Sequence, residues 1–141
     1  MTYLDANVFI EAILGQLNSQ EQAMRLIEAI EKYPKKFITS ALTYDEVFWI
    51  IQKNMGKSAA IQACQLFIEN NNLQVLDINR LVLFEASHLI EKYNLKPRDA
   101  LHAATMILEN EQEIISEDKD FDILPFKRFS IKEFVEKKLK K

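Results

Sequence analysis

The sequence is poor in the residues that several common functional sites require. Only two of its 141 residues are glycine, one is cysteine and two are histidine. The isolated Gly15 and Gly56 exclude the glycine-rich loops that bind dinucleotides or nucleoside triphosphates. So few Cys and His residues exclude a zinc site built from them, and Cys64 alone allows no internal disulfide. Carboxylates, in contrast, are abundant, with 21 Asp and Glu residues.

Long hydrophobic runs are also missing. The longest unbroken apolar run, 47–51, has five residues and is far too short to span a bilayer. The first residues show neither the charged segment nor the apolar segment of a signal peptide. A content of 48% hydrophobic and 28% charged residues is typical of a folded protein. We therefore expect one domain, 1–141, in the cytoplasm and without a membrane span.

Charge is distributed unevenly along the chain. The net charge is −3, yet residues 127–141 carry seven Lys and Arg residues against two Glu residues, and the preceding 126 residues have an excess of 8 acidic groups. A basic end on an acidic body is compatible with contact to a polyanion. It is equally compatible with a last helix whose lysines are simply solvated.

Short apolar segments alternate with longer stretches of helical periodicity. The pattern predicts strands at 3–10, 37–39, 73–76, 113–116 and 128–131, and helices at 20–33, 42–54, 57–70, 79–93 and 98–110, followed by a basic helix. Asp77 is predicted to cap the helix at 79–93, and Pro97 to begin the next one. Strands separated by helices imply right-handed crossovers. The predicted fold class is α/β, a three-layer α/β/α domain with a central, mostly parallel sheet.

Four separate segments place a carboxylate at or just after the end of a predicted strand. These carboxylates belong to Asp5, Glu46, Asp99 and Asp118. Parallel sheets bind ligands at the carboxyl ends of their strands, so we expect the four side chains to share one edge. Like charges gathered in one cleft repel one another, and a divalent cation between them offsets that cost. Oxygen ligands without Cys or His favour Mg²⁺ or Mn²⁺ over zinc.

Each carboxylate also has a purely structural interpretation. Asp5 is compatible with an ordinary polar residue at a strand end, and Glu46 with a capping box formed with the threonine three residues before it. Asp99 in a first helical turn complements the helix dipole. Asp118 and Asp120 are common turn residues. The metal-binding interpretation depends on the four carboxylates occurring together.

Two further side chains have to be placed relative to this cluster. His102 follows Asp99 by one helical turn, which is compatible with phosphate binding or proton transfer. We predict instead that His102 is a half-buried structural residue of its helix. Trp49 is predicted to lie in the hydrophobic core.

Four segments together resemble the motifs of the PIN-domain nuclease family. They are Tyr3 to Val8, Thr39 to Val47, Arg98 to Ala104 and Ser116 to Phe121. Each motif is short and weak alone, whereas all four in this order are specific and cover essentially the whole chain. The chain is most similar to the VapC-like toxins of prokaryotic toxin–antitoxin pairs.

The resemblance implies an endoribonuclease that depends on one or two Mg²⁺ or Mn²⁺ ions. The family's catalytic, metal-binding acids carry over to Asp5, Glu46, Asp99 and Asp118. Asn7 and Ser116 match the family's polar residues beside the metal, and Asp120 either supports the site or shares the role of Asp118. The resemblance also implies an RNA substrate, a small antitoxin that blocks the cleft, and a homodimer.

Two other functions are compatible with parts of the sequence. A non-catalytic PIN-like module would bind RNA or a partner protein, and the loss of one acid would favour it, but none is missing. A phosphatase of the haloacid-dehalogenase type also ends its first strand in Asp. It needs a second Asp two positions later, where this chain has Asn7. Nuclease activity is therefore the function that the sequence predicts.

Overall fold

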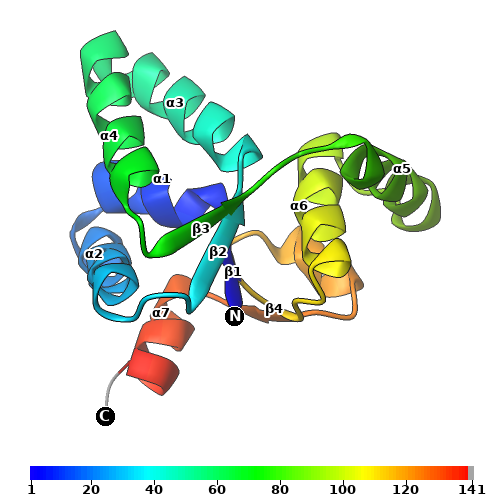
Figure 1. Ribbon diagram of the computed structural model, residues 1–141. Helices are drawn as coiled ribbons and strands as arrows, with labels where there is room; N and C mark the ends of the chain where they lie inside the picture. Colours follow the sequence, from blue (N-terminus) through cyan, green and yellow to red (C-terminus); the bar gives the residue numbers. More distant parts are fainter. Residues whose placement is uncertain (140–141) are drawn as a thin grey trace.

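A five-stranded, entirely parallel sheet forms the centre of the molecule in a computed structural model that describes residues 1–139 (Figure 1). Its strands are β1 (Thr2–Leu4), β2 (Phe37–Ser40), β3 (Leu73–Leu76), β4 (Glu113–Ile115) and β5 (Lys127–Phe129). They lie in the order β3-β2-β1-β4-β5, so the chain reverses its direction of winding beside β1. Such a reversal opens a crevice at the carboxyl ends of the central strands.

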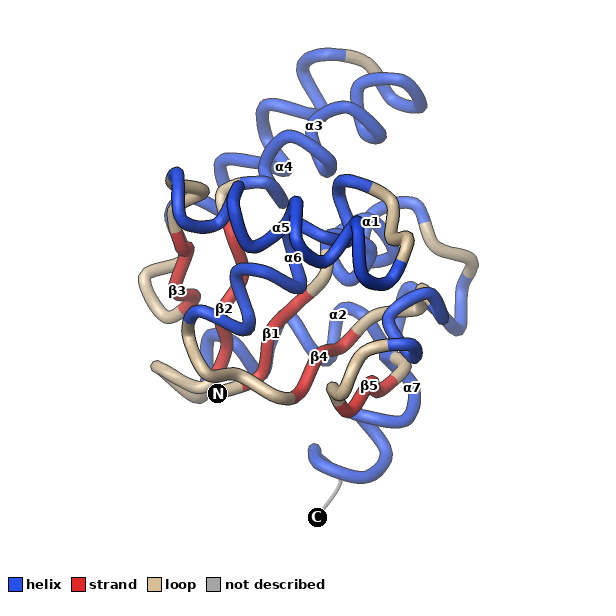
Figure 2. The backbone as a smooth tube through the Cα atoms, turned by 90° about the vertical axis from the view of Figure 1, so that its right-hand side faces the viewer, coloured by secondary structure: helices blue, strands red, loops and turns tan. Residues whose placement is uncertain are grey.

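Helices cover both faces of this sheet, as Figures 1 and 2 show. They are α1 (Ala6–Leu14), α2 (Leu17–Lys32), α3 (Leu42–Met55), α4 (Lys57–Glu69), α5 (Arg80–Tyr93), α6 (Pro97–Leu108) and α7 (Ile131–Phe134). One face packs against α1 to α4 and α7, and the other against α5, α6 and a 3₁₀ segment, Lys119–Ile123. The predicted three-layer α/β/α fold is confirmed.

The hydrophobic core is split into two parts by the sheet. Successive strand residues point to opposite faces, so Leu4 joins the core under α1 to α4 while its neighbour Tyr3 joins the core under α5 and α6. Ile115 and Ile114 divide in the same way. Strands that are buried on both faces are rich in apolar residues. In β1 and β4, the polar residues Asp5 and Ser116 follow directly after the apolar pairs, at the carboxyl edge of the sheet.

The first predicted strand, 3–10, is wrong beyond Leu4. The chain leaves the sheet there, and α1 begins at Ala6 with Asp5 as its N-cap. The carboxylate of Asp5 accepts a hydrogen bond of 2.7 Å from the backbone N–H of Ala6. Because α1 lies against the sheet and the neighbouring helices, it is apolar on a broad face, and over a few residues such a helix resembles a buried strand.

Two local predictions are also corrected. Asn79, not Asp77, caps α5, because the side-chain oxygen of Asn79 accepts from the backbone N–H of Val82 at 3.2 Å. Trp49 lies on the outer face of α3 and is 55% exposed rather than in the core. Within residues 1–139, no helix combines the length and the hydrophobicity that crossing a membrane would need.

The last described segment belongs to the folded core. Ser130 caps α7 in a reciprocal capping box with Glu133, and the chain continues as a π-helical turn, Val135–Leu139. Phe134 and Val135 are 5% and 1% exposed. The basic end predicted from the sequence is therefore anchored by apolar side chains, while its Lys140 and Lys141 lie outside the described residues.

Candidate metal centre

The four predicted acids all lie at the carboxyl edge of the sheet. Asp5 directly follows β1, and Glu46 lies one turn into α3, the helix after β2. Asp99 occupies the first turn of α6. Asp118 follows β4 and caps the 3₁₀ segment. Elements that are distant in sequence thus deliver carboxylates to one edge, where the structure groups them as two triads rather than one ring.

Asp5 is held in place by polar neighbours on both of its oxygens. It is 6% exposed, and Oδ2 accepts hydrogen bonds from Ser116 Oγ at 2.5 Å and Asn7 Nδ2 at 3.0 Å. Asn7 Nδ2 also donates to Ser116 Oγ at 3.2 Å. Burial raises the pKa of Asp5, while the charge of His102 and the hydrogen bond from Ser116 oppose this rise. Asn7 and Ser116 therefore hold the carboxylate of Asp5 in place.

The first triad combines Asp5, Glu46 and His102, whose potential ligand atoms lie within 4.8 Å of one another. His102 Nε2 lies 2.5 Å from Glu46 Oε1 and 3.6 Å from Asp5 Oδ1. On its other side, Nδ1 lies 2.5 Å from the hydroxyl of Tyr3, a residue of β1. Burial lowers the pKa of His102, but the hydrogen bond to Glu46 and the charge of Asp5 outweigh it, and the pKa is raised overall.

The prediction of a half-buried His102 is wrong, because the side chain is fully buried. It links the carboxyl edge to the core through Tyr3, a contact that sequence reasoning missed. In the sequence, Tyr3 is one residue of an apolar segment that predicts a buried strand. It is separated from His102 by 99 positions, so no local pattern indicates their contact. Only the spacing of His102 from Asp99, one turn along α6, pointed to the site.

The capping-box interpretation of Glu46 is also wrong. Ala41 is the N-cap of α3 and makes no side-chain capping bond. Thr43 Oγ1 instead pairs with Thr39 Oγ1 at 2.7 Å. The carboxylate of Glu46 is thus not used to start its helix, and it contacts His102 at the carboxyl edge.

The second triad consists of Asp99, Asp118 and Asp120. Burial raises the pKa of Asp99 to about 6, with further increases from the negative charges of Asp118, Asp5 and Asp120. Oδ2 of Asp99 is buried and has no hydrogen-bond partner within residues 1–139. Asp118 is fixed by two bonds, since its Oδ1 accepts from the Asp120 N–H and its own N–H donates to Ser116 Oγ, both at 2.9 Å.

The residues of the second triad fit a hard divalent cation such as Mg²⁺ or Mn²⁺. Their donor atoms are all carboxylate oxygens, and the unpartnered Oδ2 of Asp99 supplies a ligand atom that the protein itself leaves unused. Burial, and after it the negative charges of Asp118 and Asp120, raises the pKa of Asp99, so its ionised form is disfavoured here until a cation offsets the charge. The influence of Asp5 on the same pKa links the two triads into one acidic region.

Two exposed cations border this acidic region. Lys96 Nζ lies 4.0 Å from Asp120 and its side chain is 80% exposed, and Arg98 lies 3.8 Å from Asp45 with 55% of its side chain exposed. Contacts this long and this exposed hold a side chain weakly. Both cations precede Asp99 in sequence, by three residues and by one, and their exposed side chains are free to turn toward an anion.

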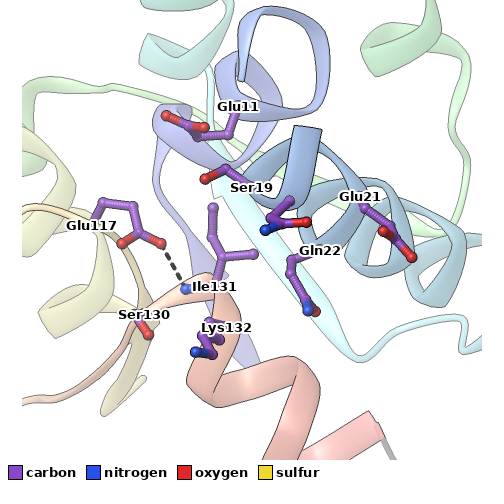
Figure 3. Close-up of a pocket in the computed structure, with 9 residues that line it drawn as sticks. Glu11, Ser19, Glu21, Gln22, Glu117, Ser130, Ile131 and Lys132 are labelled. Carbon is purple, nitrogen blue, oxygen red and sulfur yellow. Dashed lines mark hydrogen bonds between the residues drawn. The ribbon is translucent and has the colours of Figure 1, made fainter. Parts of the chain in front are cut away.

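A separate cavity is lined by Glu117, the residue after Ser116, and by residues of α1, α2 and α7 (Figure 3). Glu117, next to Ser116, donates its N–H to Asn7, and its carboxylate accepts from the backbone N–H of Ile131 at 2.8 Å. Glu11 and Glu21 also line the cavity, with Lys132 as its only cation among the described residues. This negative charge disfavours the binding of an anion in the cavity.

Comparison with known proteins identifies the class of this fold and site. The family model for the PIN domain matches residues 2–127, and the chain belongs to that family. This match does not support the alternative of a phosphatase of the haloacid-dehalogenase type. No curated protein matches the sequence.

Solved structures of toxins share this fold. VapC20 of Mycobacterium tuberculosis, described as a sarcin-ricin loop cleaving toxin, superposes with a TM-score of 0.76 at 17% identity, over 89% of this chain and 96% of that one. VapBC2 of Rickettsia felis, bound to a DNA fragment from its promoter, gives 0.69 at 20% identity over 92% and 98%. A toxin–antitoxin complex from Klebsiella pneumoniae gives 0.67 at 21% identity over 93% and 98%.

Proposed function

We propose that the protein is a metal-dependent endoribonuclease, the toxin of a VapBC-type toxin–antitoxin pair that acts on cytoplasmic RNA. The observation that carries this proposal is the acidic region at the carboxyl edge of a PIN domain, where Asp99 keeps a buried, unpartnered oxygen and a raised pKa. Toxins among the structures with the same fold support the proposal. The RNA substrate is inferred from the resemblance to the family, since none of the site residues named above is assigned to recognise the 2′-hydroxyl of a ribose.

Asp5, Asp99 and Asp118 are the proposed ligands of a first ion, with Asp120 beside them. Glu46 either binds a second ion or orients the attacking water, because only its Oε1 is engaged by His102. When bound, Mg²⁺ or Mn²⁺ lowers the pKa of water and offsets the negative charge that develops on the phosphate. Attack by water, rather than by the ribose 2′-hydroxyl, leaves 5′-phosphate and 3′-hydroxyl ends.

The remaining residues prepare this chemistry without taking part in it. Asn7 and Ser116 hold the Asp5 carboxylate, and His102 holds Glu46. Lys96 and Arg98 are placed to orient the phosphate backbone beside Asp99. Asn7, Ser116 and His102 are fixed by these hydrogen bonds before a substrate arrives, so they need no reorganisation during the reaction. The weakly held Lys96 and Arg98 turn toward the phosphate when it binds.

Cleavage assays with matched variants test the proposal. Wild-type protein should cleave members of an RNA panel in Mg²⁺ or Mn²⁺ and none in EDTA. Asp99→Asn and Asp5→Asn keep the size of the side chain but remove a ligand charge, and each should lower kcat/KM by about a hundredfold or more. The control is Asp77→Asn, which changes an exposed carboxylate outside both triads. Equal cleavage by Asp99→Asn and the control would refute the proposed site.

An antitoxin and a second copy of the chain are the proposed protein partners. The similar structures from Klebsiella pneumoniae and Rickettsia felis are toxin–antitoxin assemblies, which supports the first. Exposed apolar side chains on α5, with Leu81 at 65% and Phe84 at 70% exposure, support the second. Light scattering should give the mass of a homodimer for wild-type protein and of a monomer for Phe84→Glu. A monomeric wild type would refute the homodimer.

A further inference from the structure

The amino ends of the strands carry a group of lysines opposite the acidic region. Lys36 directly precedes β2 and Lys127 begins β5. Lys32 ends α2, and Lys138 lies in the turn after α7. Figure 1 shows the N-terminus and α7 at this same end of the sheet. We call these four residues the amino-edge basic cluster. Two of them, Lys127 and Lys138, belong to the basic end of the sequence.

A cavity of about 670 Å³ opens within this cluster. Lys32, Lys36 and Lys138 contribute the cations of its lining, and Glu113 is its only acid among the described residues. Glu113 accepts a hydrogen bond from the hydroxyl of Thr2 at 3.4 Å, and it forms no ion pair with any of the three lysines. The cavity is therefore positively charged, on a chain whose net charge is negative.

The lysines of the cluster are not neutralised by any carboxylate of the described residues. Within residues 1–139, none of the four forms an ion pair. Lys127 and Lys138 even share one neighbour, since their ammonium groups lie 5.0 and 5.8 Å from the centre of the Phe129 ring. Like charges gathered around one ring repel one another, and a bound polyanion would relieve this repulsion.

An aromatic side chain beside the lysines indicates the class of polyanion. Tyr33 lines the same cavity, is 44% exposed and lies 5.5 Å from the ammonium group of Lys32. Lysines that track a phosphate backbone, together with an exposed ring on which a base stacks, form the usual contact surface for single-stranded nucleic acid. A lipid surface would instead select a broad apolar face around the lysines.

We propose that the amino-edge basic cluster binds the backbone of single-stranded RNA, as a second contact for a segment that flanks the cleaved bond. This inference rests on the proposed function for the identity of the polyanion. It also supplies what the carboxyl edge lacks, because an acidic region gives little phosphate affinity until a cation is bound. A domain with a radius of gyration of about 14 Å separates the two edges, so only RNA much longer than a few nucleotides reaches both.

Binding measured without cleavage tests this inference. The probe is a fluorescent 20-nucleotide oligouridine in EDTA, followed by anisotropy from 50 to 300 mM salt. The test variant carries Lys32→Gln, Lys36→Gln and Lys138→Gln. The control carries Lys53→Gln, Lys57→Gln and Lys92→Gln, which remove the same charge from exposed lysines of α3, α4 and α5 that also form no ion pair within residues 1–139.

The test variant should bind the probe at least tenfold more weakly than the control at 50 mM salt. Its slope of log affinity against log salt should be shallower by about 2, since each lost phosphate contact on a single strand contributes about 0.7. Tyr33→Ala should weaken binding about fivefold or more, and Tyr33→Phe should restore it, because the phenyl ring still stacks. Circular dichroism spectra should be unchanged in all variants.

Several results would overturn the inference. Equal affinity and equal slope in the test variant and the control would show that the cluster does not contact RNA. Tighter binding of a 20-base-pair DNA duplex than of the oligouridine, lost in the same test variant, would assign the cluster to duplex DNA instead. Failure of the proposed function is distinguishable, because it would appear as absent cleavage in Mn²⁺ while the binding in EDTA persists.

Discussion

At the scale of single residues, Asp99 is a carboxyl group whose ionisation the fold disfavours. Its pKa of about 6 exceeds the ordinary value of 3.8 because burial and three neighbouring carboxylates disfavour its ionised form. The folded protein therefore holds a proton that the unfolded chain releases at lower pH. The stabilising effect of this proton is lost as the pH rises from about 4 through 6. Above that range, the ionised Asp99 opposes folding unless a cation is bound.

The raised pKa of Asp99 predicts how the stability of the metal-free protein changes with pH. In EDTA, the free energy of unfolding of the wild type should fall relative to that of Asp99→Asn as the pH rises from 4 to 7. Asparagine cannot ionise, so the variant lacks this pH dependence. Urea unfolding at several pH values measures the difference. A constant difference between the two proteins would contradict a raised pKa at Asp99.

Tyr3 and His102 give a second prediction at this scale. The hydroxyl of Tyr3 is the only hydrogen-bond partner of His102 Nδ1 among the described residues, and both side chains are fully buried. Tyr3→Phe leaves that nitrogen unpaired in the core and should lower the free energy of unfolding by about 1–3 kcal/mol. Tyr33→Phe, at an exposed position, is the control and should change the stability little. Equal stability of the two variants would mean that Nδ1 finds another partner.

At the scale of elements, amphipathic helices were predicted well and the first helix was missed. The pattern of α5 alternates buried and exposed residues at helical spacing, and Pro97 marks the start of α6. Helix α1 is buried over a wide face, so its short apolar segment carries no clear period. Asp5 serves both as the N-cap of α1 and as a member of the acidic region. In the sequence, Asp5 indicates a metal ligand as readily as a helix N-cap, so it does not by itself predict where α1 begins.

Helix α7 is held against the sheet by the aromatic side chain of Phe134. Phe134 is 5% exposed and packs edge-on against Phe37 and Phe129, with ring centres 6.0 and 5.6 Å away. Phe134→Ala should cost about 3–5 kcal/mol because a cavity remains in the core. Phe84→Ala, at a position 70% exposed, should change the stability by less than about 1 kcal/mol. A comparable effect of both substitutions in urea unfolding would show that α7 is not part of the core.

At the scale of the whole molecule, the chain separates its charges between the two edges of the sheet. The excess of lysine after residue 126 was visible in the sequence, as were the carboxylates after the strands. Neither the pairing of Lys138 with Lys32 and Lys36 around one cavity nor the link from Tyr3 to Glu46 could be read there. Both join residues that are distant along the chain, and their proximity depends on strand order and helix packing.

The stability of the whole domain should therefore depend on divalent cations. A cation that binds only the folded state stabilises it by RT ln(1 + [L]/Kd), about 2.7 kcal/mol at a hundredfold excess over Kd. For a domain of this size, that corresponds to a rise in Tm of about 10 °C between EDTA and millimolar Mn²⁺. The rise should vanish in Asp99→Asn and persist in Asp77→Asn, as measured by differential scanning fluorimetry. Because protons compete for Asp99, it should also shrink as the pH falls below about 6. A Tm that does not respond to Mn²⁺ at pH 7 would refute a metal site in the acidic region.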